Sequence, residues 1–286
     1  MKSEILVTGA TGFVGRSLVK ALAARGHVVR SHSSRDGDIA SCPLPMDGVN
    51  HVFHLAAKTF VPESWTNPSA FYRTNVMGTV NVLEHCRHNR TPVTLVSSYV
   101  YGQPQRLPIS EDHPIGANNP YAHTKVMAEE AGQFYAMDFG MRVVIVRPFN
   151  IYGPGQTPPF LIPMIVEQAM DPSRSEIRLK DLRPRRDYVY VDDAIELFLL
   201  TLSQHAKGVY NLGSGESASV AEVAELIRRA AGTDRPVMSD EQPRPQEVMD
   251  VRADVSRAAS ELGWRPKISL AEGIGKVVAA RRVQRE

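Results

Sequence analysis

Short apolar runs recur along the first half of the chain, and each is rich in β-branched residues. Runs of this length and composition are typical of strands that are buried on both faces of a sheet. The predicted strands are "EILVTG" (4–9), "HVVRS" (27–31), "HVFHLA" (51–56), "PVTLVSS" (92–98) and "MRVVIVRP" (141–148).

Amphipathic segments of helical period separate these runs. They include "FVGRSLVKALAARG" (13–26), "AFYRTNVMGTVNVLEHCRHN" (70–89) and the segment that starts near Tyr121. In the first of them Val14, Leu18, Ala21 and Leu22 form one apolar stripe, and Gly26 ends it. Apolar strands that alternate with helices predict an α/β fold, a doubly wound parallel sheet of the Rossmann type.

The amino-acid composition of the chain changes after Gly153. The stretch "GPGQTPPFLIPM" is rich in Pro and Gly, and "KDLRPRRDYVYVDD" is dense in charge. We therefore predict a second, smaller α/β domain over 151–186 and 214–286. The Rossmann domain covers 1–150, and a segment of about 187–213 returns to its sheet, since "DYVYVDDAIELFLLTL" and "VYNLGSG" are strand- and helix-like.

Composition narrows the class of protein. The chain has 286 residues, 43% hydrophobic and 22% charged, with a net charge of +2, so it can bury a sizeable core and has no basic excess for nucleic acid. It has no run of eighteen apolar residues, and glycines interrupt the apolar start as no signal peptide would allow. Its only cysteines, Cys42 and Cys86, lack metal-ligand spacing. We expect a cytoplasmic protein with reduced thiols, no metal site and no membrane partner.

The turn after the first predicted strand is rich in glycine. "ILVTGATGFVG" places Gly9, Gly12 and Gly15 in the spacing G-x-x-G-x-x-G. Small residues there let backbone N–H groups approach a diphosphate and direct the positive end of a helix at it. We expect this turn to bind a dinucleotide through Gly9, Thr11, Gly12, Phe13, Val14 and Gly15.

The residues after the second strand should select the dinucleotide. A carboxylate there would accept the ribose hydroxyls of NAD and repel a 2′-phosphate. The sequence has Ser33, Ser34 and Arg35, which suit the 2′-phosphate, so we favour NADP over NAD. Alternatively Asp36 or Asp38 takes the ribose, and Asp38–Ile39 flanks the adenine. The interval from Ser33 to His51 is short, which predicts an abbreviated third strand and helix.

Ser97 and Ser98 end the strand "PVTLVSS", at the edge where open α/β sheets bind ligands. Tyr121 and Lys125 lie four residues apart and so project from one helix face. A neighbouring ammonium and a nicotinamide cation would lower the pKa of the phenol. Tyr121 could then take a proton from a sugar hydroxyl while Lys125 holds the cofactor ribose and Ser97 holds the reacting oxygen.

With these residues in place, the chain resembles the extended short-chain dehydrogenase/reductase family of NAD(P)-dependent nucleotide-sugar epimerases and dehydratases. The matching stretches are "TGATGFVG", "VFHLAA", "TNVMGT", "VSSYVYG", "YAHTK", "RPFNIYGPG", "RRDYVYVDDA", "YNLGSG" and "LGWRPKISLAEG", in family order from end to end. The resemblance implies a Rossmann-type amino-terminal domain, a smaller carboxy-terminal substrate domain that binds a nucleotide-diphosphate sugar, and a homodimer formed by two helices from each subunit.

The resemblance also assigns residues. Ser97, Tyr121 and Lys125 match the catalytic positions. The expected cofactor pocket is completed by Leu55, Ala56, Ala57, Asn75 and Pro148. The expected sugar-nucleotide positions are Lys58, Ser98, Tyr99, Asn150, Arg186 and Arg244.

Four of these assignments have plainer alternatives. Arg186 could form a surface salt bridge with Asp187, and Arg244 could be a solvated loop charge. Asn75 could be a structural link from helix to backbone, and Ser98 could replace Ser97 as the donor to the reacting oxygen.

The family catalyses several reactions. Its 4,6-dehydratases carry an acidic residue just after the catalytic Ser or Thr, where this chain has Ser98 and Tyr99, so a dehydratase is disfavoured. A 4-epimerase or a 4-keto-sugar reductase is left, and "HLAAKTFVPESW", "NIYGPGQ" and "RPQEV" are similar to GDP-4-keto-6-deoxy-mannose reductases. The alternative from another class is a catalytically silent NAD(P)-binding redox sensor.

Overall fold

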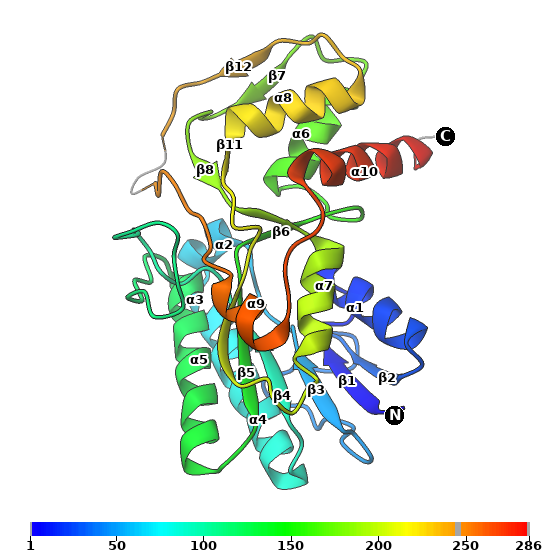
Figure 1. The fold of residues 1–286 in the computed structure, drawn as a ribbon, viewed down its shortest axis with the longest axis vertical. Helices are drawn as coiled ribbons and strands as arrows, with labels where there is room; N and C mark the ends of the chain where they lie inside the picture. The colour runs from blue at the N-terminus through cyan, green and yellow to red at the C-terminus, as the bar shows by residue number, and fades with distance from the viewer. Residues whose placement is uncertain (1, 244–246, 285–286) are drawn as a thin grey trace.

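A six-stranded sheet forms the lower part of the molecule in the computed structural model, which describes residues 2–243 and 247–284 (Figure 1). All of its strands are parallel, in the order β10-β5-β4-β3-β1-β2. The strands are β1 (Glu4–Thr8), β2 (Val28–His32), β3 (His51–His54), β4 (Val93–Val96), β5 (Val143–Pro148) and β10 (Gly208–Leu212). The five predicted strands are thus confirmed, and β10 adds a sixth.

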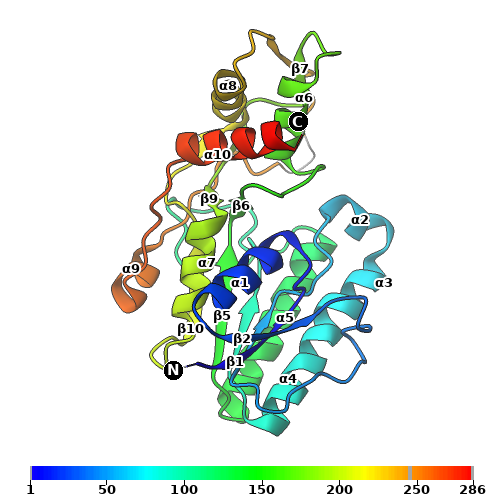
Figure 2. The same ribbon diagram turned by 90° about the vertical axis from the view of Figure 1, so that its right-hand side faces the viewer.

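Helices cover both faces of this sheet. On one face α1 (Phe13–Ala24) packs against α7 (Val191–Leu200), and on the other α4 (Gly78–Asn89) packs against α5 (Pro120–Asp138) (Figure 2). Successive side chains of β1 alternate between these two faces. Ile5 and Val7 point into the core under α1 and α7, and Leu6 points into the core under α4. The predicted doubly wound α/β fold is confirmed.

The connection between β2 and β3 departs from the usual strand–helix–strand unit. Residues 33–50 contain no helix or strand, so the helix expected to be abbreviated is replaced by a loop. Ile39 of this loop is buried against α4, where a Cβ on Gly78 would lie 2.8 Å from its Cγ2. Asn81 fastens the loop by donating from Nδ2 to the carbonyls of Ile39 and Cys42, both at 2.9 Å.

The predicted helix over 70–89 is divided. Two short helices, α2 (Val61–Thr66) and α3 (Pro68–Phe71), lead into a π-helical turn, η1 (Tyr72–Met77), that continues as α4. A π turn inside a helix is frequent at functional sites, and this one carries Asn75.

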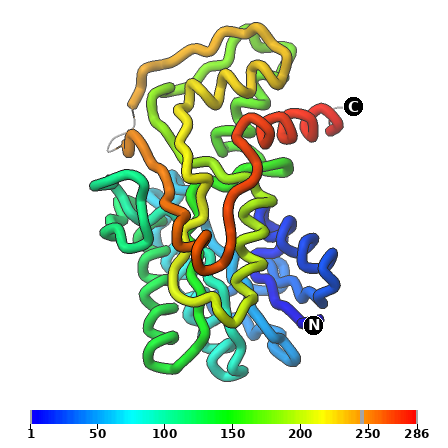
Figure 3. Tube along the Cα trace, in the orientation of Figure 1, coloured from blue at the N-terminus to red at the C-terminus, as the bar shows by residue number. Residues whose placement is uncertain are grey.

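The upper part of the molecule is built from small sheets and helices. Its elements are β7 (Ile177–Leu179), β8 (Arg185–Arg186), β11 (Ala218–Ser219), β12 (Val237–Ser239), α6 (Leu161–Met170), α8 (Val220–Ala231) and α10 (Leu270–Val283). The helices α6 and α10 both pack on α8. The C-terminal segment runs down beside β10 as α9 (Ser256–Leu262) and then returns upward as α10 (Figure 3).

The segment expected to return to the large sheet does so in part. The helix α7 and the strand β10 lie in the lower part, but β9 (Tyr188–Tyr190) pairs with β6 (Asn150–Tyr152) in a separate two-stranded sheet between the two parts. The positions at which the two domains divide stay a prediction. Among the residues the structure describes, no helix is long and apolar enough to cross a membrane.

Candidate active site

The helix α5 begins at the residues that place Tyr121. Pro120 occupies its first position, and the Asn119 side chain caps it by accepting a hydrogen bond from Ala122 N at 2.8 Å. Tyr121 and Lys125 therefore share one face of the first turns, as the spacing predicts. The edge of the buried Phe71 ring meets the Tyr121 ring at a centroid distance of 6.4 Å and orients it.

Ser97 and Ser98 follow β4 at the carboxyl edge of the sheet. The Ser97 backbone N–H donates to the Val146 carbonyl at 2.7 Å, which fixes the end of β4 against β5. Both serines are more than 90% buried, and within the described part of the chain neither hydroxyl has a hydrogen-bond partner. Buried hydroxyls are rarely left unpaired, so two adjacent ones mark a place where a polar ligand can bind.

Lys125 is buried at the same edge. Its Nζ donates to the Val96 carbonyl at 2.6 Å, and burial lowers the pKa of the ammonium to about 8, against the opposing effect of the Glu129 carboxylate. Ser97, Lys125 and Glu129 line one cavity of about 10 Å³, room for roughly one water molecule. The serine and the lysine are thus brought together although the sequence separates them.

The expected lowering of the Tyr121 pKa involves both Lys125 and a bound nicotinamide, and it stays a prediction. Burial raises the pKa of the Tyr121 phenol. The Ser98 hydroxyl partly offsets that rise, although the pair falls outside the geometry of a full hydrogen bond. The Lys125 ammonium donates to the Val96 carbonyl. With its pKa raised, the Tyr121 phenol holds its proton near neutral pH.

The glycine turn has the shape that a dinucleotide diphosphate requires. A Cβ on Gly15 would lie 2.2 Å from the Gly9 carbonyl oxygen, and one on Gly9 would lie 2.7 Å from Ala56 N. Gly12 precedes α1 and offers no capping side chain, so the first N–H groups of that helix are available to an anion. These positions fit the group that the sequence predicts.

The other expected cofactor positions lie at the same edge of the sheet. Leu55, Ala56 and Ala57 directly follow β3, and Pro148 is the last residue of β5. Parallel strands bring their carboxyl ends to one edge, which is why the segments at the ends of β1, β2, β3, β4 and β5 lie together there.

The loop after β2 contains an unexpected carboxylate contact. Asp36 Oδ2 accepts hydrogen bonds from Ser33 N at 2.8 Å and Ser33 Oγ at 2.9 Å, so the hydroxyl expected to hold a 2′-phosphate is already engaged. Arg35 and Ser34 are exposed beside it. Asp38 is paired with Arg73 at 2.8 Å in an exposed contact, and its expected place beside the adenosine stays a prediction.

Asn75 lies in η1 and is buried, with all of its side-chain hydrogen bonds made to protein. Its Oδ1 accepts from Lys58 N at 2.8 Å, and its Nδ2 donates to Lys58 O at 3.0 Å and to Thr124 Oγ1 at 2.9 Å. These contacts fit the alternative of a structural link, which ties the loop after β3 to α5. The Lys58 ammonium itself pairs with Glu63 at 2.9 Å.

The expected sugar-nucleotide residues have protein partners as well. The Tyr99 hydroxyl donates to the Gly102 carbonyl at 2.6 Å, and Asn150 Nδ2 donates to the Asp187 carbonyl at 2.9 Å. Arg186 forms its ion pair with Glu247, not with Asp187 as the alternative proposed. Asp187 is fully buried and instead binds the Ser214, Gly215 and Ala253 backbone N–H groups. Arg244 lies outside the described residues.

An ion pair that the sequence analysis missed lies one turn behind Lys125. Glu129 and Arg147 are both about 4% exposed, and Arg147 binds the carboxylate through Nε at 3.0 Å and Nη2 at 2.6 Å. Arg147 Nη1 also reaches the Tyr101 hydroxyl at 3.1 Å. Two signals could have found it, because Glu129 is four residues beyond Lys125 and Arg147 is the only charged residue inside the strand "VVIVRP".

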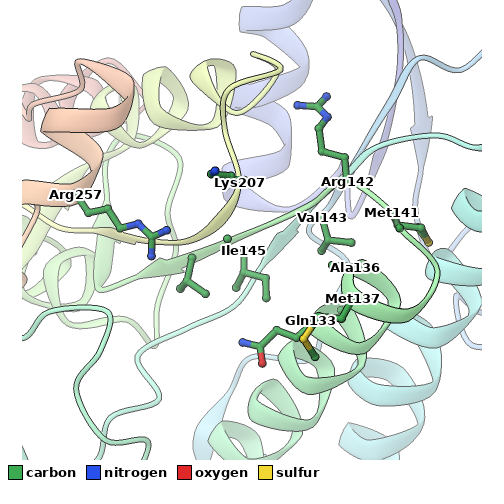
Figure 4. Close-up of a pocket in the computed structure, with 13 residues that line it drawn as sticks. Gln133, Ala136, Met137, Met141, Arg142, Val143, Ile145, Lys207 and Arg257 are labelled. Atoms are coloured by element: carbon green, nitrogen blue, oxygen red, sulfur yellow. The ribbon is translucent and has the colours of Figure 1, made fainter.

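A larger cavity lies elsewhere in the described structure. It measures about 560 Å³ and lies between the C-terminal half of α5 and the starts of β5 and β10, lined by residues such as Gln133, Val143 and Val209 (Figure 4). That is the opposite end of the strands from Ser97 and Tyr121, so the cavity is not the candidate active site.

The parallel sheet, the glycine turn and the Tyr–Lys pair define the class of Rossmann-fold enzymes that use a nicotinamide dinucleotide. Residues 5–213 match the model of the NAD dependent epimerase/dehydratase family. The chain belongs to this family.

Named relatives catalyse different reactions. A GDP-6-deoxy-D-mannose reductase of Pseudomonas aeruginosa is 30% identical, over 98% of this chain and 97% of its own. A dTDP-glucose 4,6-dehydratase of Streptomyces griseus is 31% identical, over 98% of this chain and 94% of its own. The crystal structure of UDP-glucose 4-epimerase from Thermotoga maritima with UDP-glucose superposes with a TM-score of 0.91 at 26% identity, covering 99% of this chain and 100% of the other.

Proposed function

We propose that this protein acts on C4 of a nucleotide-diphosphate sugar, with Ser97, Tyr121 and Lys125 as its catalytic residues. One observation supports the proposal above all. Two buried serine hydroxyls without a hydrogen-bond partner in the described chain lie close to the buried Lys125 and the Tyr121 phenol, at the same edge of the sheet as the glycine turn. A nicotinamide bound beside them would supply or accept the hydride at the carbon that bears the reacting oxygen.

Each side chain has a separate task. Ser97 donates a hydrogen bond to the oxygen on C4 and holds it toward the phenol. Tyr121 passes a proton to that oxygen when a ketone is reduced and takes it back when an alcohol is oxidised. Lys125 supplies a positive charge that favours the phenolate, which Tyr121 becomes as it donates its proton and must be before it accepts one, once the ammonium turns from the Val96 carbonyl to the cofactor ribose.

The reaction is 4-keto-sugar reduction or 4-epimerisation, which need the same three residues. Elimination of water in a 4,6-dehydratase needs a carboxyl group after the catalytic serine. Here Ser98 stands at that place, and the Tyr99 hydroxyl donates to a carbonyl, with burial raising its pKa above the ordinary value for a phenol. Neither can act as the acid and base of an elimination near neutral pH, although one relative is a dehydratase.

The assay that tests the proposal separates the two outcomes. Stoichiometric oxidation of NADPH on addition of a GDP-, UDP- or dTDP-4-keto-6-deoxy sugar identifies a reductase. Formation of the C4 epimer without added cofactor identifies an epimerase. Absence of turnover with all three nucleotides, in protein that binds the dinucleotide, would overturn the enzymatic proposal in favour of a redox sensor.

We propose NADP as the dinucleotide, bound at its 2′-phosphate by Ser34 and Arg35. Asp36 opposes this preference, because its carboxylate is held at Ser33 and would repel the phosphate. We expect Arg35→Ala to weaken NADPH binding about tenfold and NADH binding less than about twofold, since only NADPH loses a charge-assisted contact.

The matching change at the carboxylate is Asp36→Asn, which should strengthen NADPH binding selectively. Fluorescence titration of both cofactors measures the two variants. An Arg35→Ala variant that weakens NADPH and NADH equally would remove Arg35 from the phosphate site.

The proposed role of Lys125 predicts a pH dependence. The pKa of Lys125 is lowered to about 8, so its side chain carries a proton and a positive charge below that pH and loses both as the pH rises through it. The phenol, whose pKa is raised, stays protonated over the same range. For ketone reduction, kcat/KM should therefore be level near neutral pH and fall about tenfold per pH unit above pH 8.

Profiles of kcat/KM from pH 6 to pH 10 test this expectation, with Lys125→Arg as the comparison because guanidinium does not titrate there. Wild-type kcat/KM that stays level to pH 9.5 would contradict it.

A further inference from the structure

The side chain of Arg16 joins two loops that belong to different parts of the molecule. Arg16 lies in the first turn of α1, and its Nη1 donates to the Thr11 carbonyl of the glycine turn at 2.7 Å. Its Nη2 donates to the Gly155 carbonyl at 3.2 Å, across 139 residues of sequence. Gly155 belongs to the loop between β6 and α6, which leads into the upper part of the molecule.

Apolar packing holds the same two segments together. A Cβ on Gly153 would lie 2.5 Å from Val191 Cγ1 and 3.5 Å from the Phe13 ring, so the loop lies directly on the start of α1. In Figures 1 and 2 the chain that follows β6 passes over the N-terminal end of α1. The contact of Arg16 with Gly155 is therefore one edge of a packed junction, not an isolated surface contact.

We propose that Arg16 holds the 153–156 loop against the glycine turn and thereby slows release of the bound dinucleotide. We call this pair of contacts, from Arg16 to the Thr11 and Gly155 carbonyls, the clasp. This inference rests on the proposed function, because it requires the glycine turn to bind the diphosphate. Arg16 is a positioning residue, since it acts through the Thr11 and Gly155 carbonyls.

The guanidinium suits this role better than an ammonium would. Its planar fork places two N–H groups toward two acceptors at once, and each donor is held by the same rigid group. The Thr11 carbonyl that it binds lies in the turn that is expected to hold the diphosphate. Binding it keeps the turn in the conformation that directs its N–H groups at an anion.

The clasp has different consequences for the two proposed reactions. An epimerase returns the hydride to its substrate and keeps its dinucleotide, so a closed clasp does not limit it. A reductase must release the oxidised dinucleotide after each turnover, so the clasp must open once in every cycle.

Release rates test the inference without any nucleotide sugar. The protein is loaded with NADPH, and in parallel with NADH, and is then mixed in a stopped-flow instrument with a large excess of the oxidised cofactor. The decay of reduced-cofactor fluorescence gives the dissociation rate constant. The variants are Arg16→Met and Arg16→Lys, with Arg25→Met as the control, because Arg25 directly follows the same helix and its guanidinium contacts the exposed Glu196 and the Ala21 carbonyl, far from the glycine turn.

We expect Arg16→Met to release the dinucleotide about tenfold faster than the wild type, the effect of losing charged hydrogen bonds at a partly exposed site. Arg25→Met should stay within about twofold of the wild type. Arg16→Lys should remain several-fold faster than the wild type, since one ammonium keeps the charge but not the two-way bridge.

Three results would overturn the clasp. Equal release rates for Arg16→Met and Arg25→Met would show that the bridge does not hold the dinucleotide. A wild-type rate in Arg16→Lys would mean that positive charge alone is responsible. Failure of the wild type to bind either cofactor would refute the proposed function itself, and is distinct from the first two results because no dissociation rate could then be measured.

Discussion

Replacing Tyr121 with phenylalanine is expected to lower kcat by about a thousandfold or more while leaving the Kd for the dinucleotide within about threefold of the wild type. The substitution removes one oxygen, and that oxygen carries the proton in the proposed reaction, a contribution of about a hundred- to ten-thousandfold for a general acid or base. The ring packing against Phe71 is retained, so the candidate active site should keep its shape.

The control for this variant lies on the same helix. Tyr135 is also in α5, and its hydroxyl donates to Glu84 of α4 at 2.5 Å, outside the candidate active site. Tyr135→Phe should leave kcat nearly unchanged. Steady-state assays on the accepted nucleotide sugar, together with cofactor titration, measure both variants. Normal turnover by Tyr121→Phe would assign the proton transfer to another group.

The buried ion pair between Glu129 and Arg147 should give the largest change in stability. We expect Glu129→Gln to lower the free energy of unfolding by about 3–5 kcal/mol, because it leaves a guanidinium buried without its carboxylate. Burial alone would lower the pKa of Arg147, but its hydrogen bonds to Glu129 and the charge of that carboxylate outweigh burial and raise the pKa, which indicates how strongly the guanidinium depends on its partner. Removing both charges in Glu129→Leu with Arg147→Met should recover most of the loss.

Urea-induced unfolding at neutral pH measures these effects. The matched control is Arg229→Gln, which breaks the exposed pair with Glu225 and should cost less than about 1 kcal/mol. A Glu129→Gln variant as stable as this control would mean that the buried pair does not hold α5 against β5. A double variant no more stable than the single one would mean that shape, not charge, holds these elements together.

Local patterns in the sequence predicted much of the fold and part of the candidate active site. The β-branched runs predicted five strands because a buried strand has no polar face to present. The four-residue spacing of Tyr121 and Lys125 placed them on one face of α5 because the helical period allows no other outcome. The glycines at 9, 12 and 15 predicted a tight turn, and the close approach of Gly15 to the Gly9 carbonyl gives the reason.

Contacts between distant segments were beyond the same patterns. The sequence offered Asp187 as a partner for Arg186, since the two are adjacent, but the guanidinium reaches Glu247 instead. It offered Ser33 to a 2′-phosphate, whereas a local turn presents that hydroxyl to Asp36. In both cases the competing partner was visible in the sequence, but its position depends on how the backbone folds.

The sequence by itself determined the class of fold, the order of its elements and the spacing of Tyr121 and Lys125, because period and turn chemistry act over a few residues. Only the tertiary structure decided the electrostatic state of those groups. The pKa of Lys125 falls to about 8 and that of Tyr121 rises because packed segments remove water from them, and Glu129 meets Arg147 because α5 lies against β5. Burial and charge pairing are properties of the assembled chain, and no local pattern fixes them.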